Sequence, residues 1–169
     1  MFISDKEVRS ELDEVFSTEA SLTEINTCVP ILRGGDEILQ RIPSRSKENW
    51  KIYPITVRSY SDELKKQENH TYVNIPEKTL NFLLHEYNKH SKILVLDDIY
   101  HTGKTLKILQ SFLEFNESYN SENVYYLIFV NKSTSGNNYL YKLHNTFWVR
   151  NVKENDWVEF EWERNRNQS

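Results

Sequence analysis

Two adjacent carboxylates, Asp97 and Asp98, follow the apolar run 93–96 (ILVL). A continuous apolar run of this kind predicts a strand that is buried on both faces of a parallel sheet. Ligands of such sheets bind at the carboxyl ends of the strands. Paired carboxylates at that place can accept hydrogen bonds from vicinal hydroxyls and hold a hydrated Mg²⁺. We therefore expect Asp97 and Asp98 to be catalytic residues that bind a diol and, directly or through water, a magnesium ion.

The segment 101–105 (HTGKT) has the composition of a phosphate site. Its donors are backbone N–H groups at a predicted helix start, two hydroxyls and one amine. They belong to His101, Thr102, Gly103, Lys104 and Thr105. A nucleotide-binding P-loop would need glycine at position 98, where Asp98 would repel a triphosphate. The pattern favours a single phosphate monoester, and a phosphate, a diol and Mg²⁺ at this spacing describe a ribose 5-phosphate. A plain helix start is the alternative.

The whole segment 93–105 (ILVLDDIYHTGKT) resembles the phosphoribosyl pyrophosphate (PRPP) motif of type I phosphoribosyltransferases. That motif has an apolar strand, two acidic residues and then T-G-[KG]-[ST]. The segment 29–35 (VPILRGG) is similar to the family's pyrophosphate-binding loop, which follows the first core strand. The resemblance implies that Arg33, Gly34 and Gly35 bind the pyrophosphate, because a glycine pair lets backbone amides approach it closely. Taken alone, R-G-G is more often a simple turn.

Ser59 and Tyr60 are similar to a Ser-Tyr pair that begins a mobile loop over the active site in purine phosphoribosyltransferases. The segment 59–70 is polar, charged and without periodicity, which predicts a long exposed loop. A plain hairpin loop is the alternative.

The C-terminal segment 155–163 (NDWVEFEWE) resembles the W-[IV]-x-x-P-W-[DE] segment of xanthine-guanine phosphoribosyltransferases. The resemblance implies that Trp157 stacks on a purine and that the backbone near Val158 contacts the edge of the purine. Lys132 ends a predicted strand, as does the family lysine that donates to the purine 6-oxo group, and a lysine there prefers an oxo acceptor over an amino donor. The alternatives are a packing aromatic at Trp157 and a solvated lysine at Lys132.

Two residues depart from the family pattern. His101 stands where the relatives usually have an aspartate, the proposed base at purine N7. Histidine can accept the same proton near neutral pH but cannot supply the same fixed negative charge. In the alternative, His101 gives only its backbone N–H to the phosphate. Glu161 stands where the family segment has proline, which fixes φ and removes a donor, so the base-contact segment is expected to differ in shape.

Strands and helices alternate along the chain, which predicts an α/β fold with a mainly parallel sheet. Ser4 and Glu7 form a capping box before a helix expected from about Asp5 to Phe16. Further helices are expected from Asp36, Pro76 and Gly103. Strands are expected at 28–32, 50–58, 72–75, 93–96, 124–130 and 147–149.

The resemblance implies the type I phosphoribosyltransferase fold, with a twisted, mainly parallel sheet of about five strands flanked by helices and a small hood made by the chain ends. We expect one domain over residues 1–163 and a polar, frayed tail over 164–169.

Composition restricts the class of protein further. The 169 residues carry 21 Lys plus Arg against 25 Asp plus Glu, a net charge of −4, which argues against general binding of nucleic acid. The longest apolar run, 125–130, is too short to span a bilayer, and charges from Asp5 onward do not fit a signal peptide. The single cysteine, Cys28, fits a reducing compartment. We expect a cytoplasmic homo-oligomer, a dimer or tetramer.

The expected reaction transfers ribose 5-phosphate from Mg²⁺-PRPP to a 6-oxopurine, giving a nucleoside 5′-monophosphate and pyrophosphate. Two alternatives stay open. One is a PRPP-binding regulatory protein of the same fold with little catalysis. The other is a phosphoribosyltransferase for another base.

Overall fold

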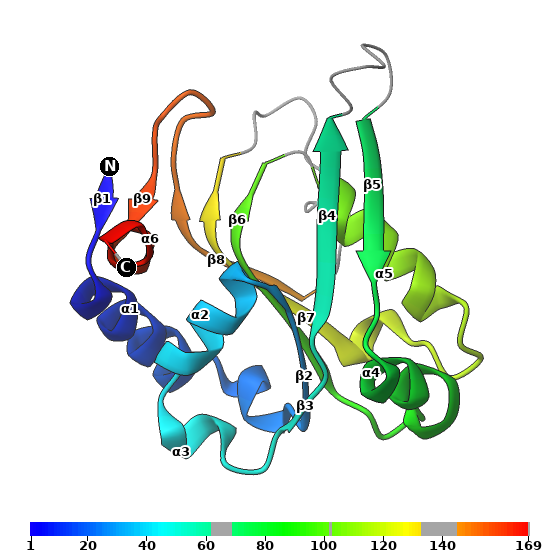
Figure 1. Ribbon diagram of the computed structural model, residues 1–169. Coiled ribbons are helices and arrows are strands. Elements are labelled where there is room, and N and C mark those ends of the chain that lie inside the picture. The colour runs from blue at the N-terminus through cyan, green and yellow to red at the C-terminus, as the bar shows by residue number, and fades with distance from the viewer. Residues whose placement is uncertain (62–68, 102, 133–144, 169) are drawn as a thin grey trace.

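The computed structural model describes residues 1–61, 69–101, 103–132 and 145–168. Within these ranges, a seven-stranded sheet runs in the order β5-β4-β2-β6-β7-β8, with β3 also paired to β2 (Figure 1). Its strands are β2 (Thr27–Leu32), β3 (Lys51–Ile52), β4 (Ile55–Ser61), β5 (Asn69–Asn74), β6 (Ile93–Tyr100), β7 (Val124–Asn131) and β8 (Thr146–Asn151). Each neighbouring pair is parallel except β4 and β5, which are antiparallel. The sheet is therefore mainly parallel, as predicted.

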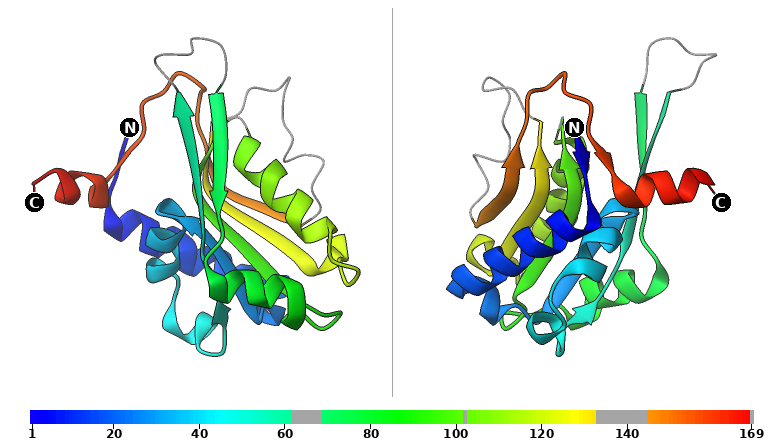
Figure 2. Two further views of the ribbon diagram at one scale, coloured as in Figure 1. Left: turned by 45° about the vertical axis from the view of Figure 1, so that its right-hand side comes forward. Right: turned by 90° about the vertical axis from the view of Figure 1, so that its left-hand side faces the viewer.

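Helices cover both faces of the sheet (Figure 2). They are α1 (Asp5–Thr18), α2 (Gly34–Arg41), α3 (Ser44–Lys47), α4 (Glu77–Asn81), α5 (Lys104–Glu114) and α6 (Glu161–Gln168), with 3-10 turns at Ala20–Glu24 and Ser121–Asn123 and a π turn at Phe82–Glu86. Successive side chains of a strand point to opposite faces. Leu94 and Leu96 of β6 accordingly pack into one core with α1 and α2, whereas Ile93 and Val95 pack into a second core with α5. This double burial explains why the strand is apolar throughout.

Helix starts follow local signals in the chain. The Ser4 hydroxyl accepts from the N–H of Glu7 (3.2 Å), and the Glu7 carboxylate accepts from the N–H of Ser4 (2.8 Å), which confirms the capping box. Helix α5 follows Gly103, whose φ of 76° lies in the left-handed region that favours glycine. Helix α2 begins at Gly34, two residues before the expected start at Asp36, with Arg33 as its N-cap.

The chain ends form a hood at the edge of the sheet where the parallel strands end (Figures 1 and 2). The short strands β1 (Phe2–Ile3) and β9 (Glu159–Phe160) pair in parallel, and α6 follows β9 directly. This confirms the predicted hood. The residues from Arg164 onward are helical to Gln168, however, and not a frayed tail. No helix in the described part of the chain combines the length and the apolar character that a membrane span requires.

Two strand predictions need correction. The strand expected over 50–58 is divided into β3 and β4 around Tyr53 and Pro54. The strand expected to end at Leu96 continues to Tyr100, so Asp97 and Asp98 lie within β6, beside the ladder to β7. Both carboxylates still stand in the carboxyl-terminal half of the central strand.

Candidate active site

Several predicted site residues, among them Gly34, Asp98 and Lys132, lie where β2, β6 and β7 end. The three strands are parallel neighbours, with Pro30 opposite Leu96 and Tyr100 opposite Asn131. The loop after β2 therefore lies beside the acidic pair of β6. Lys132 follows β7 directly, and its N–H donates to the carbonyl of Tyr100 (2.9 Å). The register of the sheet thus places segments from three parts of the sequence at one edge.

Gly34 and Asp98 lie in direct contact across this edge. A Cβ atom at position 34 would overlap the carboxyl group of Asp98, so only glycine leaves room for that carboxylate. A Cβ at Gly35 would overlap the backbone carbonyl of Leu96 and lie 3.2 Å from the carbonyl carbon of Pro30. The first turn of α2 is therefore packed against the backbone of β6. The peptide bond between Leu32 and Arg33, just before this turn, is cis.

Asp97 and Asp98 are partly buried, and each carboxylate accepts a hydrogen bond from the backbone. The N–H of Asp98 donates to Oδ1 of Asp97 (2.9 Å), and the N–H of Ile99 donates to Oδ1 of Asp98 (2.8 Å). Burial raises the pKa of both carboxyls, and the neighbouring Asp98 charge raises the pKa of Asp97 further. A bound cation would offset this mutual repulsion.

The oxygen donors of this pair fit Mg²⁺. Among the residues that the structure describes, no three His, Cys, Asp or Glu side chains lie close enough together to hold a metal ion. Mg²⁺ commonly uses one or two carboxylates and takes its other ligands from water and substrate phosphates. Asp97 and Asp98 are therefore a suitable protein contribution to a substrate-bound Mg²⁺.

The phosphate segment lies at the amino end of α5. Among the described residues, no side chain caps this helix, so the N–H groups of its first turn are available to an anion. Gly103 is buried, and a Cβ there would lie 2.6 Å from the hydroxyl of Tyr100. Lys104 is exposed and Thr105 is partly buried. Thr102 lies outside the described residues.

The connection that carries two of the predicted base-binding residues contacts this segment at His101. Nε2 of His101 is 3.7 Å from Oε1 of Glu154, which belongs to the connection between β8 and β9. That connection leads to Trp157, whose side chain is 78% exposed, and then to the buried Val158. The exposure of Trp157 contradicts the alternative of a packing aromatic. Lys132 is partly buried.

Known structures match the fold of this chain, although no protein-family model and no curated protein matches the sequence. A purine phosphoribosyltransferase from Pyrococcus horikoshii is 15% identical, with a TM-score of 0.66 over 96% of this chain and 92% of that chain. The xanthine-guanine-hypoxanthine phosphoribosyltransferase of Helicobacter pylori is 19% identical, with a TM-score of 0.64 over 99% and 97%. A hypothetical protein from Neisseria gonorrhoeae, solved with bound ppGpp, is 15% identical, with a TM-score of 0.74 over 98% and 93%.

The chain has the phosphoribosyltransferase fold. Within that fold, the segment 93–105, similar to the PRPP motif, comprises β6 and the start of α5, and the segment 29–35, similar to the pyrophosphate loop, runs from β2 into the start of α2. The sequence prediction of the fold is confirmed. The roles of the individual site residues stay predictions.

One predicted part of the site is placed differently. Ser59 and Tyr60 were expected to begin a loop, but both lie in β4, opposite Thr71 and His70 of β5. The prediction that the loop starts at Ser59 is wrong, because the antiparallel ladder continues to Ser61. The end of the expected loop, Asn69 and His70, lies in β5, and residues 62–68 lie outside the described residues.

Sequence reasoning missed two contacts of this chain. Glu154 was not singled out, because an acidic residue in a polar connection carries no local signal for a partner more than fifty positions away. The partner of Glu161 was also missed: its carboxylate accepts from the N–H of Asp5 (2.6 Å) at the start of α1. Only the folded chain brings these groups together.

Proposed function

We propose that the protein transfers the phosphoribosyl group of Mg²⁺-PRPP to a 6-oxopurine, giving a purine nucleoside 5′-monophosphate and pyrophosphate. The observation that carries this proposal is the contact of the Asp98 carboxylate with Gly34. It joins an acidic pair suited to a diol and Mg²⁺ to a glycine pair suited to a diphosphate. The uncapped start of α5, which follows the same strand, adds a place for the 5′-phosphate.

The residues of the chain would hold PRPP at three points. The N–H groups at the start of α5, with Lys104 and Thr105, bind the 5′-phosphate. Asp97 and Asp98 accept hydrogen bonds from the ribose hydroxyls and hold Mg²⁺. Arg33 and the amides of the glycine pair bind the pyrophosphate. When bound, Mg²⁺ neutralises charge that develops on the leaving pyrophosphate.

The purine would lie between the exposed Trp157 ring and the end of β7. Stacking on an aromatic ring contributes about 1–3 kcal/mol per base. Lys132 donates to the 6-oxo oxygen, and the backbone near Val158 contacts the purine edge. The bond from ribose C1 to the pyrophosphate oxygen breaks, a bond from C1 to purine N9 forms, and the proton on N7 passes to His101. Holding both substrates in line supplies much of the rate.

The test is a product assay with a base panel. The protein is incubated with Mg²⁺-PRPP and hypoxanthine, guanine, xanthine, adenine or uracil, and any nucleotide is identified by mass. The variant with both Asp97→Asn and Asp98→Asn serves as the control, and its PRPP affinity should fall tenfold or more because two charged acceptors are lost. Absence of a nucleotide product from every base would overturn the proposed transfer.

A second candidate is a regulatory protein that binds PRPP or ppGpp without transfer. Two observations favour it: the neighbour with a TM-score of 0.74 was solved with ppGpp, and His101 stands where the relatives usually have an aspartate. Calorimetric titration with PRPP and with ppGpp distinguishes the two candidates. Tight binding of either ligand by wild-type protein that forms no nucleotide would support regulation.

A further inference from the structure

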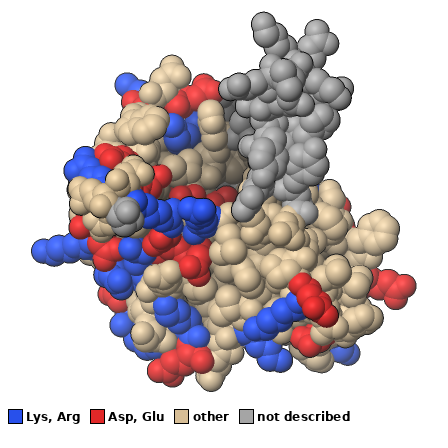
Figure 3. Space-filling model, viewed as in Figure 1, with Lys and Arg blue, Asp and Glu red and all other residues tan. Residues whose placement is uncertain are grey.

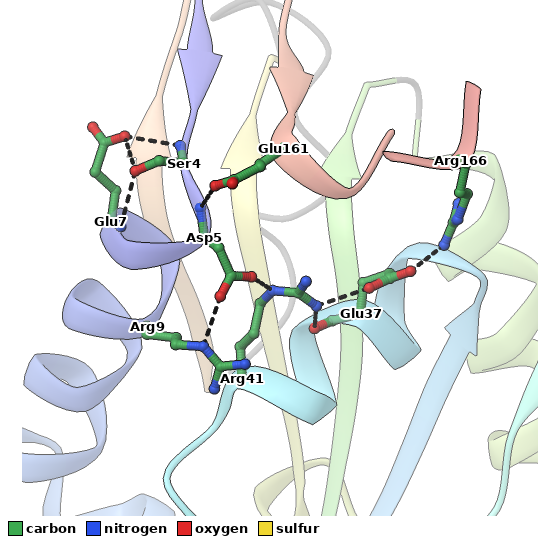
Figure 4. A network of polar contacts seen from close by, with 8 residues as sticks. All are labelled: Ser4, Asp5, Glu7, Arg9, Glu37, Arg41, Glu161 and Arg166. Atoms are coloured by element: carbon green, nitrogen blue, oxygen red, sulfur yellow. Dashed lines mark hydrogen bonds and ion pairs between the residues drawn. The ribbon is translucent and has the colours of Figure 1, made fainter. Parts of the chain in front are cut away.

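Glu161 ties the hood to the first helix of the chain. It begins α6 directly after β9, and its Oε2 accepts from the N–H of Asp5, the first residue of α1, at 2.6 Å (Figure 4). The first N–H groups of a helix have no partner inside the helix, so this carboxylate satisfies one of them and its charge suits the helix dipole. The proline of the similar family segment has no side-chain acceptor. The hydrogen bond between Glu161 and Asp5 therefore depends on the glutamate that this chain has in place of proline.

A second tie passes through Arg41 at the end of α2. Its guanidinium pairs with Asp5 of α1, and its Nη1 lies 2.8 Å from Oε2 of Glu37 (Figure 4). Arg166 of α6 pairs with the same Glu37. The side chains of Arg41 and Glu37 are only 11% and 15% exposed, so this pairing is less screened by solvent than ordinary surface pairs. Basic and acidic side chains lie interspersed over the hood, α1 and α2 in Figure 3.

The same guanidinium also makes a cation–π contact with an aromatic side chain of the hood. The Cζ atom of Arg41 lies 4.4 Å from the centroid of the Trp162 ring, and the Trp162 ring stacks on the Phe160 ring with a centroid distance of 4.2 Å and an interplanar angle of 9°. Phe160 in turn meets Phe129 of β7 edge-on at 5.9 Å. The stack therefore runs from the central sheet through β9 and α6 to α2. Arg41 lies at the end of this stack, and its guanidinium is paired with Asp5 of α1 and Glu37 of α2.

These contacts fix the backbone just after the exposed Trp157. The N–H of Glu159 donates to the carbonyl of Met1 (2.9 Å) within the β1–β9 pairing, and Val158 is buried beneath. An indole that is 78% exposed gains little from its own packing. The carbonyl of Trp157 accepts from the amino group of Met1 (2.5 Å), and Glu161, four residues after Trp157, accepts from the N–H of Asp5.

We propose that Glu161 and Arg41 are positioning residues that hold the segment 157–160 in the place where it meets the purine. This inference rests on the proposed function for its effect on the base. That these two side chains hold the segment 157–160 in place does not depend on the proposed function. Affinity for the purine should therefore depend on two side chains that never touch it, whereas affinity for PRPP should not.

The experiment compares Glu161→Ala with Glu161→Gln, whose amide oxygen still accepts from the N–H of Asp5. Exposed Glu14 of α1, replaced by alanine, is the matched control. Amide hydrogen exchange over 157–160 is measured in each protein, together with KM for the purine and for PRPP. Glu161→Ala should speed the exchange and raise the purine KM about tenfold, equivalent to ~1.4 kcal/mol, with the KM for PRPP unchanged. Glu161→Gln and Glu14→Ala should behave as wild type.

A second variant, Arg41→Lys, keeps the charge but loses the planar fork that pairs two carboxylates while stacking on a ring. It should change exchange and purine KM in the same direction as Glu161→Ala. Exchange over 157–160 that matches wild type in both variants would overturn the fastening, whatever the activity. Faster exchange with an unchanged purine KM would overturn the positioning role. If wild-type protein forms no nucleotide, the proposed transfer reaction is refuted. The hydrogen-exchange rates then still test whether Glu161 and Arg41 hold the segment 157–160 in place.

Discussion

Replacing Gly34 by alanine tests the contact on which the proposed site depends. The added Cβ would lie less than 3.0 Å from the Asp98 carboxyl group, a separation that real Cβ atoms essentially never have. Gly34 is not among the residues with positive φ, so its backbone accepts alanine. The Asp98 side chain must therefore rotate away, and its carboxylate leaves the place where we expect it to bind ribose and Mg²⁺.

Two magnitudes set the expected result. Hydrogen bonds to charged groups contribute about 1.5–3 kcal/mol, so loss of one such contact weakens PRPP binding roughly 10- to 100-fold. The change in stability should be small. Loss of the hydrogen bond from Ile99 to Asp98 costs about 1 kcal/mol, and alanine in place of a helical glycine returns roughly 0.5–1 kcal/mol.

The assay is calorimetric titration of Mg²⁺-PRPP together with a thermal melt. Gly35→Ala is the contrasting variant, because its Cβ meets the backbone carbonyl of Leu96, which cannot rotate away. That overpacking should cost about 1–3 kcal/mol and lower the Tm by several degrees. Wild-type PRPP affinity in a folded Gly34→Ala protein would refute the assignment of Asp98 to the ribose and metal.

Three further predictions concern other groups. His101→Ala should lower kcat by roughly 10²–10⁴-fold if the imidazole takes the purine proton, and steady-state rates equal to wild type would exclude that role. If Lys132 donates to a 6-oxo group, hypoxanthine, guanine or xanthine should react and adenine should not, because an amino group would leave two donors facing each other; faster turnover of adenine than of every oxopurine contradicts this. Hydrogen bonds from Ser4 and the charge of Arg150 lower the pKa of Glu7 to about 2. Since this lies below the unfolded value of ~4.3, ionised Glu7 stabilises the fold above about pH 4, and the contribution is lost as the pH falls toward 2. The Tm of Glu7→Gln should accordingly lie below that of wild type at pH 7 and meet it near pH 2, and a gap that does not change with pH would count against this.

Local patterns in the sequence were sufficient for much of the fold. The apolar runs of β6 and β7 are buried on both faces, and the capping box of Ser4 and Glu7 forms as its spacing predicts. The division between β3 and β4 also had a local signal. Pro54 has no N–H to donate to a ladder, so a break in pairing is expected there.

Other features depended on contacts between distant residues. The segment 161–168 alternates at first and is strongly polar, yet it is helical. Trp162 packs between Phe160 and Arg41, and the carboxylate of Glu163 accepts from the N–H of Phe160 at 2.7 Å. Tertiary packing therefore overrides the local pattern. Within the site, the sequence motif indicated which segments meet, but the contact of Gly34 with Asp98 required the register of β2 and β6.

The pairing of the chain ends has a consequence for the order of folding. Asp5 and Glu161 are 156 residues apart. Closing a loop of that length in an unfolded chain costs about 4.5 kcal/mol, counting only the part of the loop-closure entropy that grows with the logarithm of the loop length. A two-residue ladder cannot offset this alone, so the hood forms after the central sheet has brought the ends near each other. Synthesis adds about 5–20 residues per second. A nascent chain therefore contains its acidic pair and phosphate segment for seconds before the last residues of the hood exist, so the residues proposed to bind PRPP are synthesised before those proposed to bind the base.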